Sequence, residues 1–231
     1  MESFKIDTHV HTSEVSHCGK VRACELVKLY AEKKYNALVI TDHYHSDYFD
    51  SLGNIEWKEK IDCYLTGYRK AKRKGEKLGM QIILGIELRF TESPNDYLVY
   101  GMDEEFLYEN PELHKMTFEE FYRFRAGKGI AIYQAHPFRK NMTVQESNML
   151  DGIEVLNGNP RHDSHNPLAL EHARFNKLRM LGGSDFHQVQ DLAGGGIIIE
   201  KLPASSKDFA EYILGNNRVT LIGIENLDKS A

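Results

Sequence analysis

Short apolar runs alternate with longer segments of helical period along almost the whole chain. Strands are predicted at Phe4–Asp7, Ala37–Ile40, Gln81–Gly85, Tyr97–Gly101, Gly129–Gln134, Gly152–Val155 and Met180–Gly183, with a last run at Gly196–Ile199. A strand–helix alternation repeated about seven times favours parallel strands joined by helical crossovers, in a sheet whose two faces are both covered. Periodicity does not distinguish a closed barrel from an open doubly wound sheet.

The segments between these runs carry helix signals. Apolar residues from Trp57 to Ala71 fall on one face at helical spacing. Thr117 and Glu120 form a T-x-x-E capping box, and Ser205 is an N-cap candidate. No linker, low-complexity tract or internal repeat interrupts the 231 residues, so one domain spanning 1–231 is expected.

Composition excludes several classes of partner. The formal net charge of -5 argues against duplex DNA or an anionic membrane as the main partner, because both require a basic face. The three cysteines are an odd number without C-x-x-C spacing, which favours a reducing compartment. The chain carries no signal-peptide pattern and no apolar stretch long enough to span a membrane, so a soluble, cytoplasmic protein is expected.

Histidines and carboxylates recur where the predicted strands end. The segments are Asp7-Thr8-His9-Val10-His11-Thr12, Thr41-Asp42-His43, Gly85-Ile86-Glu87, Ala135-His136-Pro137 and Gly183-Ser184-Asp185-Phe186-His187. His9 and His11 are two residues apart on an extended segment, so their side chains point the same way. In parallel α/β folds the carboxyl ends of the strands share one rim. Residues distant in sequence are therefore expected to meet around a metal ion there.

The ligand types restrict the metal. Imidazole and carboxylate together suit zinc, manganese or iron, whereas calcium and magnesium prefer mainly oxygen. A site without an evident cysteine ligand and with several carboxylates favours catalysis over a closed structural zinc site. Cys18 is interpreted as a small buried thiol, with approach to a metal as the alternative. His114 is expected on the surface of a helix.

The ordered set D-x-H-x-H-T, T-D-H, G-I-E, A-H-P and G-S-D-x-H resembles the PHP (polymerase and histidinol phosphatase) domain family, over Asp7 to His187. The resemblance implies a distorted (β/α)7 TIM-like barrel with a site for two or three divalent ions at the carboxyl rim of its strands. Many members are phosphoesterases.

The resemblance also implies a ligand set for each ion. The first ion would be held by His9, His11, Glu87 and Asp185, the second by Glu87 and His136, and the third by His17, His43 and His187. Many relatives place a histidine just before the fourth strand as a ligand of the second ion. Asp96 occupies that position here. Aspartate can ligate, but it changes the local charge.

The expected reaction is hydrolysis of a small phosphomonoester, similar to histidinol phosphate or a nucleotide, by a metal-bridging water held at Glu87 and Asp185. Arg139 and Arg161 are the candidates for binding the phosphate, with solvated surface charges as the alternative. Asp7 and Asp42 either accept hydrogen bonds from ligand imidazoles or cap strand ends.

Two rival functions stay open. A nuclease acting on nucleic-acid ends is disfavoured by the acidic charge balance and by the lack of a basic groove studded with aromatic residues. A metal-stabilised regulatory domain without turnover would not require nearly every ligand of the set. The expected partner is thus a small phosphorylated substrate, with no membrane; the sequence does not indicate an oligomeric state.

Overall fold

A computed structural model of the chain describes residues 2–224. The strands are β1 (Phe4–Val10), β2 (Ala37–Ile40), β3 (His43–Tyr44), β4 (Gln81–Leu84), β5 (Ile86–Arg89), β6 (Asp96–Tyr100), β7 (Ala131–Gln134), β8 (Gly152–Asn157), β9 (Arg179–Gly183), β10 (Ile197–Ile199) and β11 (Thr220–Leu221). The α-helices are α1 (Ala23–Glu32), α2 (Ser46–Ser51), α3 (Trp57–Tyr64), α4 (Thr66–Leu78), α5 (Glu104–Glu109), α6 (Phe118–Phe124), α7 (Asn166–Asn176) and α8 (Ser206–Leu214). Short 3-10 helices are η1 (Leu113–Lys115), η2 (Ser147–Met149) and η3 (Val189–Asp191).

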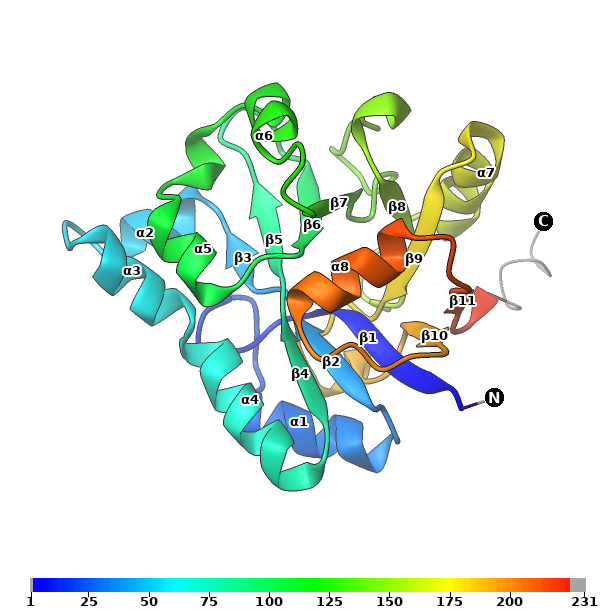
Figure 1. Cartoon of the computed structure of the whole chain (residues 1–231), viewed down its shortest axis with the longest axis horizontal. Helices are drawn as coiled ribbons and strands as arrows, with labels where there is room; N and C mark the ends of the chain where they lie inside the picture. The colour runs from blue at the N-terminus through cyan, green and yellow to red at the C-terminus, as the bar shows by residue number, and fades with distance from the viewer. Residues whose placement is uncertain (1, 225–231) are drawn as a thin grey trace.

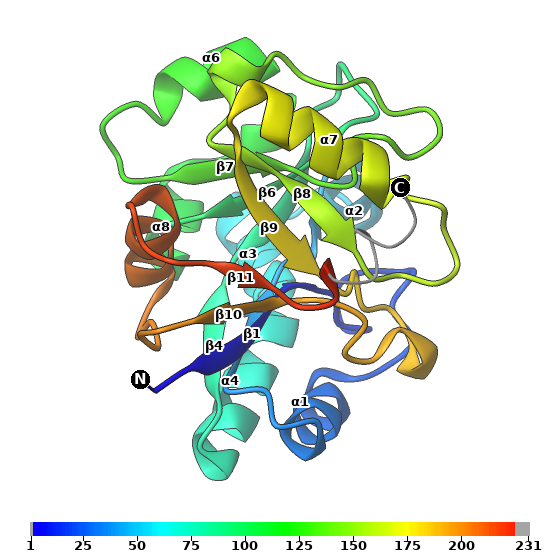
Figure 2. The same cartoon turned by 90° about the vertical axis from the view of Figure 1, so that its right-hand side faces the viewer.

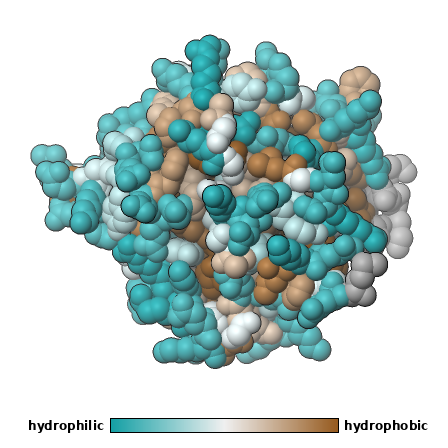
Figure 3. Space-filling view, viewed as in Figure 1, coloured by the Kyte–Doolittle hydropathy of each residue, from teal (hydrophilic) through white to brown (hydrophobic). Residues whose placement is uncertain are grey.

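The strands form two sheets, in the orders β11-β10-β1-β2-β4 and β3-β5-β6-β7-β8-β9. Helices α1 and α4 pack together beside β4, α7 covers β8 and β9, and α8 lies against β6 and β7 (Figure 1). Figure 2 shows β10 beside β1 and β11 beside β10. On the face seen in Figure 3, hydrophilic residues predominate, with smaller hydrophobic patches between them.

Not all strands are parallel, and here the sequence-based expectation was wrong. Strand β6 runs antiparallel to both β5 and β7, and β10 runs antiparallel to β1. The reason is the connection: residues 90–95 between β5 and β6 form a short loop rather than a helical crossover, and a short loop joins antiparallel neighbours. The start of β6 therefore lies at the same rim as the end of β5.

The two sheets are linked to each other at two places. Only Gly85 separates β4 from β5, and the backbone N–H of Glu87 donates to the carbonyl of Asp42. On the other side the N–H of His11 donates to the carbonyl of Phe186, at 3.0 Å. The fold is thus mixed α/β in two continuing sheets, while closure into one seven-stranded barrel stays a prediction.

Local signals were read correctly at several helices. Both hydrogen bonds of the Thr117–Glu120 capping box are present, and the Ser205 side chain accepts from Asp208 N at 3.1 Å to begin α8. Strand β2 is buried along its whole length, as a near-continuous apolar run requires. No helix within residues 2–224 is long and apolar enough to cross a bilayer.

His114 corrects another expectation. It lies in η1 and is 1% exposed, because its ring stacks on Phe49 with centroids 5.0 Å apart. Its Nδ1 is buried without a hydrogen-bond partner among the described residues. Burial lowers the pKa of His114 to about 4 from its ordinary 6.5, since a protonated ring would lose hydration there.

Replacing His114 with phenylalanine is expected to flatten the loss of stability on acidification. The pKa is depressed in the folded state, so the stabilisation is present above the unfolded pKa and is lost as pH falls toward 4. Between about pH 7 and pH 5 this residue alone should cost about 2 kcal/mol of unfolding free energy. Urea unfolding of both proteins at the two pH values, with chelator present, measures it; equal losses in the two proteins would contradict the assignment.

Candidate metal centre

A cluster of imidazoles and carboxylates lies at the rim where most of the strands end. It comprises His9 on β1, His11 directly after β1, His43 on β3, Glu87 on β5, Asp96 at the start of β6, His136 after β7, and Asp185 and His187 after β9. All are buried except His43, whose side chain is 18% exposed. Because charged and imidazole groups are rarely buried together without a compensating partner, this cluster marks a specialised site.

Glu87 lies at the centre of the cluster. Its Oε1 is 3.1 Å from Nε2 of His136 and 3.3 Å from Nε2 of His9. Its Oε2 is 3.3 Å from Nε2 of His11 and 2.6 Å from Nδ1 of His43. Each carboxylate oxygen therefore faces a different pair of imidazoles, which is the arrangement that a carboxylate bridging two ions requires.

The cluster divides into four groups whose donor atoms all lie within 4.8 Å of one another. These groups are His9 with His11 and Glu87, His9 with His136 and Asp185, Glu87 with Asp96 and His136, and His11 with His43 and His187. Two atoms of these groups, Glu87 Oε2 and His43 Nδ1, are buried and face each other at 2.6 Å without any other hydrogen-bond partner. The mixture of imidazole and carboxylate donors fits divalent zinc, manganese or iron.

The electrostatics keep the carboxylates ionised. Burial raises the pKa of Glu87, but the charges of His43 and His9 outweigh it and hold that pKa well below the ordinary value. For Asp185 burial is likewise outweighed, mainly by the charge of His9, and its pKa is also well below the ordinary value. Both groups are therefore available as anionic ligands at neutral pH.

Backbone strain accompanies two of these positions. Asp185 has φ 51° and His136 has φ 29°, in the left-handed region that side chains other than glycine seldom adopt. Such conformations persist where the surrounding structure imposes them, often at functional sites. Gly183 permits the close approach of β9 to β1, because a Cβ there would lie 2.4 Å from the Cβ of His9.

His17 does not join the cluster. It is exposed and belongs to none of the four groups, and its nearest aromatic neighbour is Tyr48, with ring centroids 6.3 Å apart. The group that contains His43 and His187 has His11 as its third member instead of His17.

Cys18 is also not the buried thiol of the sequence-based interpretation. It is exposed, and its Sγ lies 3.2 Å from Nε2 of His43. Burial raises the pKa of Cys18, but hydrogen bonds with His187 and His43 lower it to about 6.

Asp96 does lie beside Glu87 and His136, with Oδ2 4.0 Å from Nε2 of His136. However, Arg89 donates to both of its oxygens, from Nε to Oδ1 at 2.8 Å and from Nη2 to Oδ2 at 2.8 Å. A metal at this group would therefore share Asp96 with a guanidinium, which weakens the carboxylate as a ligand.

Comparisons with known proteins show the family and the fold. The family model of the PHP domain matches residues 7–181. The chain belongs to the PHP family. No curated protein sequence matches it.

Solved structures resemble this PHP chain in fold. A two-domain protein from Bacteroides vulgatus that contains a predicted PHP-like metal-dependent phosphoesterase has TM-score 0.67 and 20% identity, over 96% of this chain and 65% of that one. This chain thus spans just under two thirds of that protein. PsfC from Pseudomonas syringae has TM-score 0.65 and 17% identity, over 96% and 92% of the two chains. An amidohydrolase from Chromobacterium violaceum, with bound sulfate and no metal, has TM-score 0.54 and 15% identity, over 89% and 95%.

Glu154 is a residue of this PHP site that the sequence analysis missed. It lies on β8 and is 1% exposed. Its Oε1 accepts from Nδ1 of His9 at 2.9 Å, while its Oε2 accepts from the backbone N–H of His136 and from Nδ2 of Asn157, at 3.0 and 2.9 Å. Glu154 therefore fixes the His9 ring and the strained His136 backbone together. The available signal was a lone glutamate inside a strand predicted to be buried.

Asp7 and Asp42 accept hydrogen bonds from backbone N–H groups and hydroxyls rather than from ligand imidazoles. Asp7 Oδ1 accepts from the N–H groups of His9 and Ser184, at 3.2 and 3.0 Å. Asp42 Oδ1 accepts from Thr12 N and from Ser16 Oγ, both at 2.7 Å. Burial raises the pKa of each carboxyl to about 6. Ser16 Oγ lies in turn 3.1 Å from Nδ1 of His11, so Asp42 orients that ring only indirectly.

The two arginines predicted to bind phosphate both hold carboxylates. Nη2 of Arg139 donates to Asp185 Oδ2 at 2.8 Å and also to Asn157 and Ser164. Arg161 donates from Nε and Nη2 to the two oxygens of Asp191, at 3.1 and 2.8 Å. Arg139 thereby fixes one oxygen of Asp185 and leaves Oδ1 facing His9 and His11, 3.4 Å from Nε2 of each.

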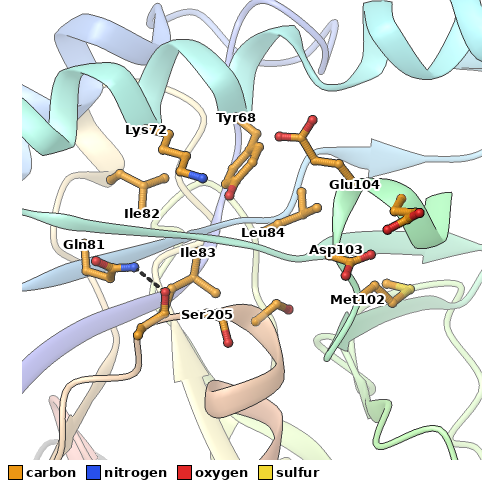
Figure 4. A pocket seen from close by; sticks show the side chains of 13 residues that line it. Tyr68, Lys72, Gln81, Ile82, Ile83, Leu84, Met102, Asp103, Glu104 and Ser205 are labelled. Atoms are coloured by element: carbon orange, nitrogen blue, oxygen red, sulfur yellow. Dashed lines mark hydrogen bonds between the residues drawn. The ribbon is translucent and has the colours of Figure 1, made fainter. Parts of the chain in front are cut away.

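A separate groove of about 350 Å³ lies between α4, β4 and the start of α8 (Figure 4). Tyr68 and Lys72 line it from α4, and Gln81 Nε2 donates to the carbonyl of Ala204 across it at 2.7 Å. None of its lining residues is a predicted metal ligand. The groove runs along the whole of β4, from Gln81 to Leu84.

Replacing Glu154 with glutamine is expected to weaken metal binding by about 10–100-fold. An amide in this place turns one acceptor into a donor, which then opposes either the His9 ring or the His136 N–H. Competition against a chromogenic chelator measures the affinity. The matched control is Glu119→Gln, on a side chain that is 63% exposed. Equal affinities of Glu154→Gln and the wild type would contradict the assigned role.

Proposed function

We propose that this chain is a metal-dependent phosphoesterase that hydrolyses a small phosphomonoester. The observation that carries the proposal is Glu87, a fully buried carboxylate whose two oxygens face separate pairs of imidazoles. Membership of the PHP family supports it, as does the phosphoesterase description of the Bacteroides vulgatus neighbour. The ligands proposed are His9, His11, His43, Glu87, His136, Asp185 and His187, with Asp96 shared with Arg89.

Bound divalent ions would supply Lewis-acid stabilisation of the phosphoryl oxygens and a water of lowered pKa. Glu87 and Asp185 are the ionised carboxylates placed to position the ions and that water. Arg139 fixes one oxygen of Asp185 and leaves the other facing the imidazoles. Glu154 prevents the His9 ring from turning. These residues prearrange the charges against which a phosphoryl group is bound.

His45 is not the proton donor of this proposal, although it lies beside the rim. Burial, with the nearby charges of His43 and Arg89, lowers the pKa of His45 to about 4, so the ring is neutral at pH 7. Its Nδ1 instead accepts from the backbone N–H of Tyr48 at 3.4 Å and caps α2. Its role in the proposal is therefore structural.

A small substrate fits the surroundings better than a polymer does. A cavity of about 160 Å³ is lined by His45, Arg89 and Phe90, among others, and Arg89 also holds Asp96. The net charge of -5 disfavours polyanions as substrates. Specificity is assigned to the loops at 44–55 and 138–147, which border the rim.

Replacing Glu87 with glutamine is expected to lower hydrolysis of p-nitrophenyl phosphate by on the order of 100-fold or more, because the amide cannot offer an anionic oxygen to each side. Metal content measured by elemental analysis should fall in the same variant. Treatment of the wild type with chelator should abolish turnover, and zinc, manganese or iron should restore it. Glu119→Gln is the control on an exposed side chain.

The outcomes separate the rival functions. Full activity of Glu87→Gln with unchanged metal content would overturn the proposal. Cleavage of single-stranded oligonucleotides without activity on mononucleotides or small phosphomonoesters would favour the nuclease. Stoichiometric metal without turnover on any phosphoester would favour a regulatory domain stabilised by metal.

A further inference from the structure

Cys18 lies against the open side of the metal cluster. Its Sγ is 3.2 Å from Nε2 of His43, and a contact with His187 contributes to its lowered pKa. Ligands on one tetrahedral zinc ion, about 2.0–2.1 Å away for nitrogen and about 2.3 Å for sulfur, are themselves roughly 3.5 Å apart. The Cys18–His43 separation is therefore close to that of two ligands on a shared ion.

The backbone places this thiol, because the loop that carries it is fixed on both sides. Residues 16–19 form a turn in which Gly19 N donates to Ser16 O at 2.8 Å, and Lys20 N donates to the carbonyl of His187 at 2.7 Å. The N–H of His43 donates to Ser16 Oγ at 3.1 Å. A Cβ at position 19 would lie 2.9 Å from the carbonyl oxygen of Thr12, so glycine permits the close approach. The same turn leaves His17 exposed.

A second observation points independently to an ion at this place. The groups His11, His43 and His187 bring three imidazole nitrogens within 4.8 Å of one another. Glu87 is fully buried, and its Oε2 has no hydrogen-bond partner although it lies 2.6 Å from His43 and 3.3 Å from His11. A cation beside these imidazoles would satisfy that oxygen on the Nδ1 side of His43, whereas Cys18 lies at Nε2 on the other side of the same ring. The ion that Cys18 would bind is therefore one held through His43 Nε2.

We propose that Cys18, rather than His17, completes the site formed by His43 and His187 as a thiolate ligand. When a divalent ion binds, the S–H bond breaks, the sulfur keeps the electron pair that forms the metal–sulfur bond, and the proton passes to solvent. A thiolate is a soft ligand, so this position would favour zinc, cobalt or iron over manganese and magnesium. The inference rests on the metal centre of the proposed function.

Cobalt substitution tests the ligand directly. The full-length protein, freed of metal and reloaded with cobalt(II), is expected to show a near-ultraviolet sulfur-to-cobalt charge-transfer band, and X-ray absorption of the zinc-loaded protein is expected to show one sulfur at about 2.3 Å. Cys18→Ser should lose both signals and should bind zinc at this position at least about 10-fold more weakly. Cys24→Ser and Cys63→Ser, the other exposed thiols, should keep both signals.

Several outcomes would overturn the inference. A wild-type protein loaded with three metals but lacking a sulfur signal would do so, and this measurement needs no variant that folds. Retention of the charge-transfer band in Cys18→Ser would also overturn it. So would the loss of one metal ion in His17→Ala while the metal content of Cys18→Ser stays unchanged. Absence of any bound metal in the wild type would overturn the proposed function as well, whereas bound metal without sulfur contradicts the Cys18 assignment alone.

Discussion

The structure of the rim depends on the burial of one carboxylate, Glu87, among imidazoles. A buried carboxylate is costly unless opposite charges or ions compensate it, and here His43 and His9 lower its pKa by charge. Glu87 lies near the start of β5, which follows β4 after Gly85 alone, so it stands where the two sheets continue into each other. The remaining donors come from β1, β3 and β6 and from the segments after β1, β7 and β9.

A further layer of polar residues holds these donors in place. Glu154 joins the His9 ring to the His136 backbone, and Asp7 joins the His9 backbone to Ser184. Arg139 likewise donates a hydrogen bond to Asp185 and so holds its carboxylate in place. Because each of these groups satisfies two segments distant in sequence, the donor positions are coupled, and the strained backbone at His136 and Asp185 is maintained by its neighbours.

The solvent-exposed side of the metal centre differs from its buried side in the chemistry of the side chains that border the donors. Toward β8 the donors are enclosed by buried carboxylates, whereas toward the turn at 16–19 the donors meet an exposed thiol. A phosphoester would approach from an open side, while the buried side sets the charge of the ions. The combination of hard carboxylates at one end and a soft sulfur at the other would give the ions of one centre unequal preferences among metals.

The sequence by itself determined the motif set and the family, because His, Asp and Glu recur in five short segments whose pattern requires no tertiary information. Strands β3 and β5, which carry His43 and Glu87, were not predicted. The sequence also identified local helix starts such as Thr117 and Ser205, whose capping bonds involve residues three apart. Only the tertiary structure decided that β6 is antiparallel, which brings Asp96 to the rim but pairs it with Arg89. It likewise placed Glu154 beside His9, 145 residues away, and put the exposed Cys18 rather than His17 beside His43. These are long-range or loop-geometry effects: neither the partner of a side chain across the sheet nor the direction of a residue in a turn follows from residue type and spacing alone.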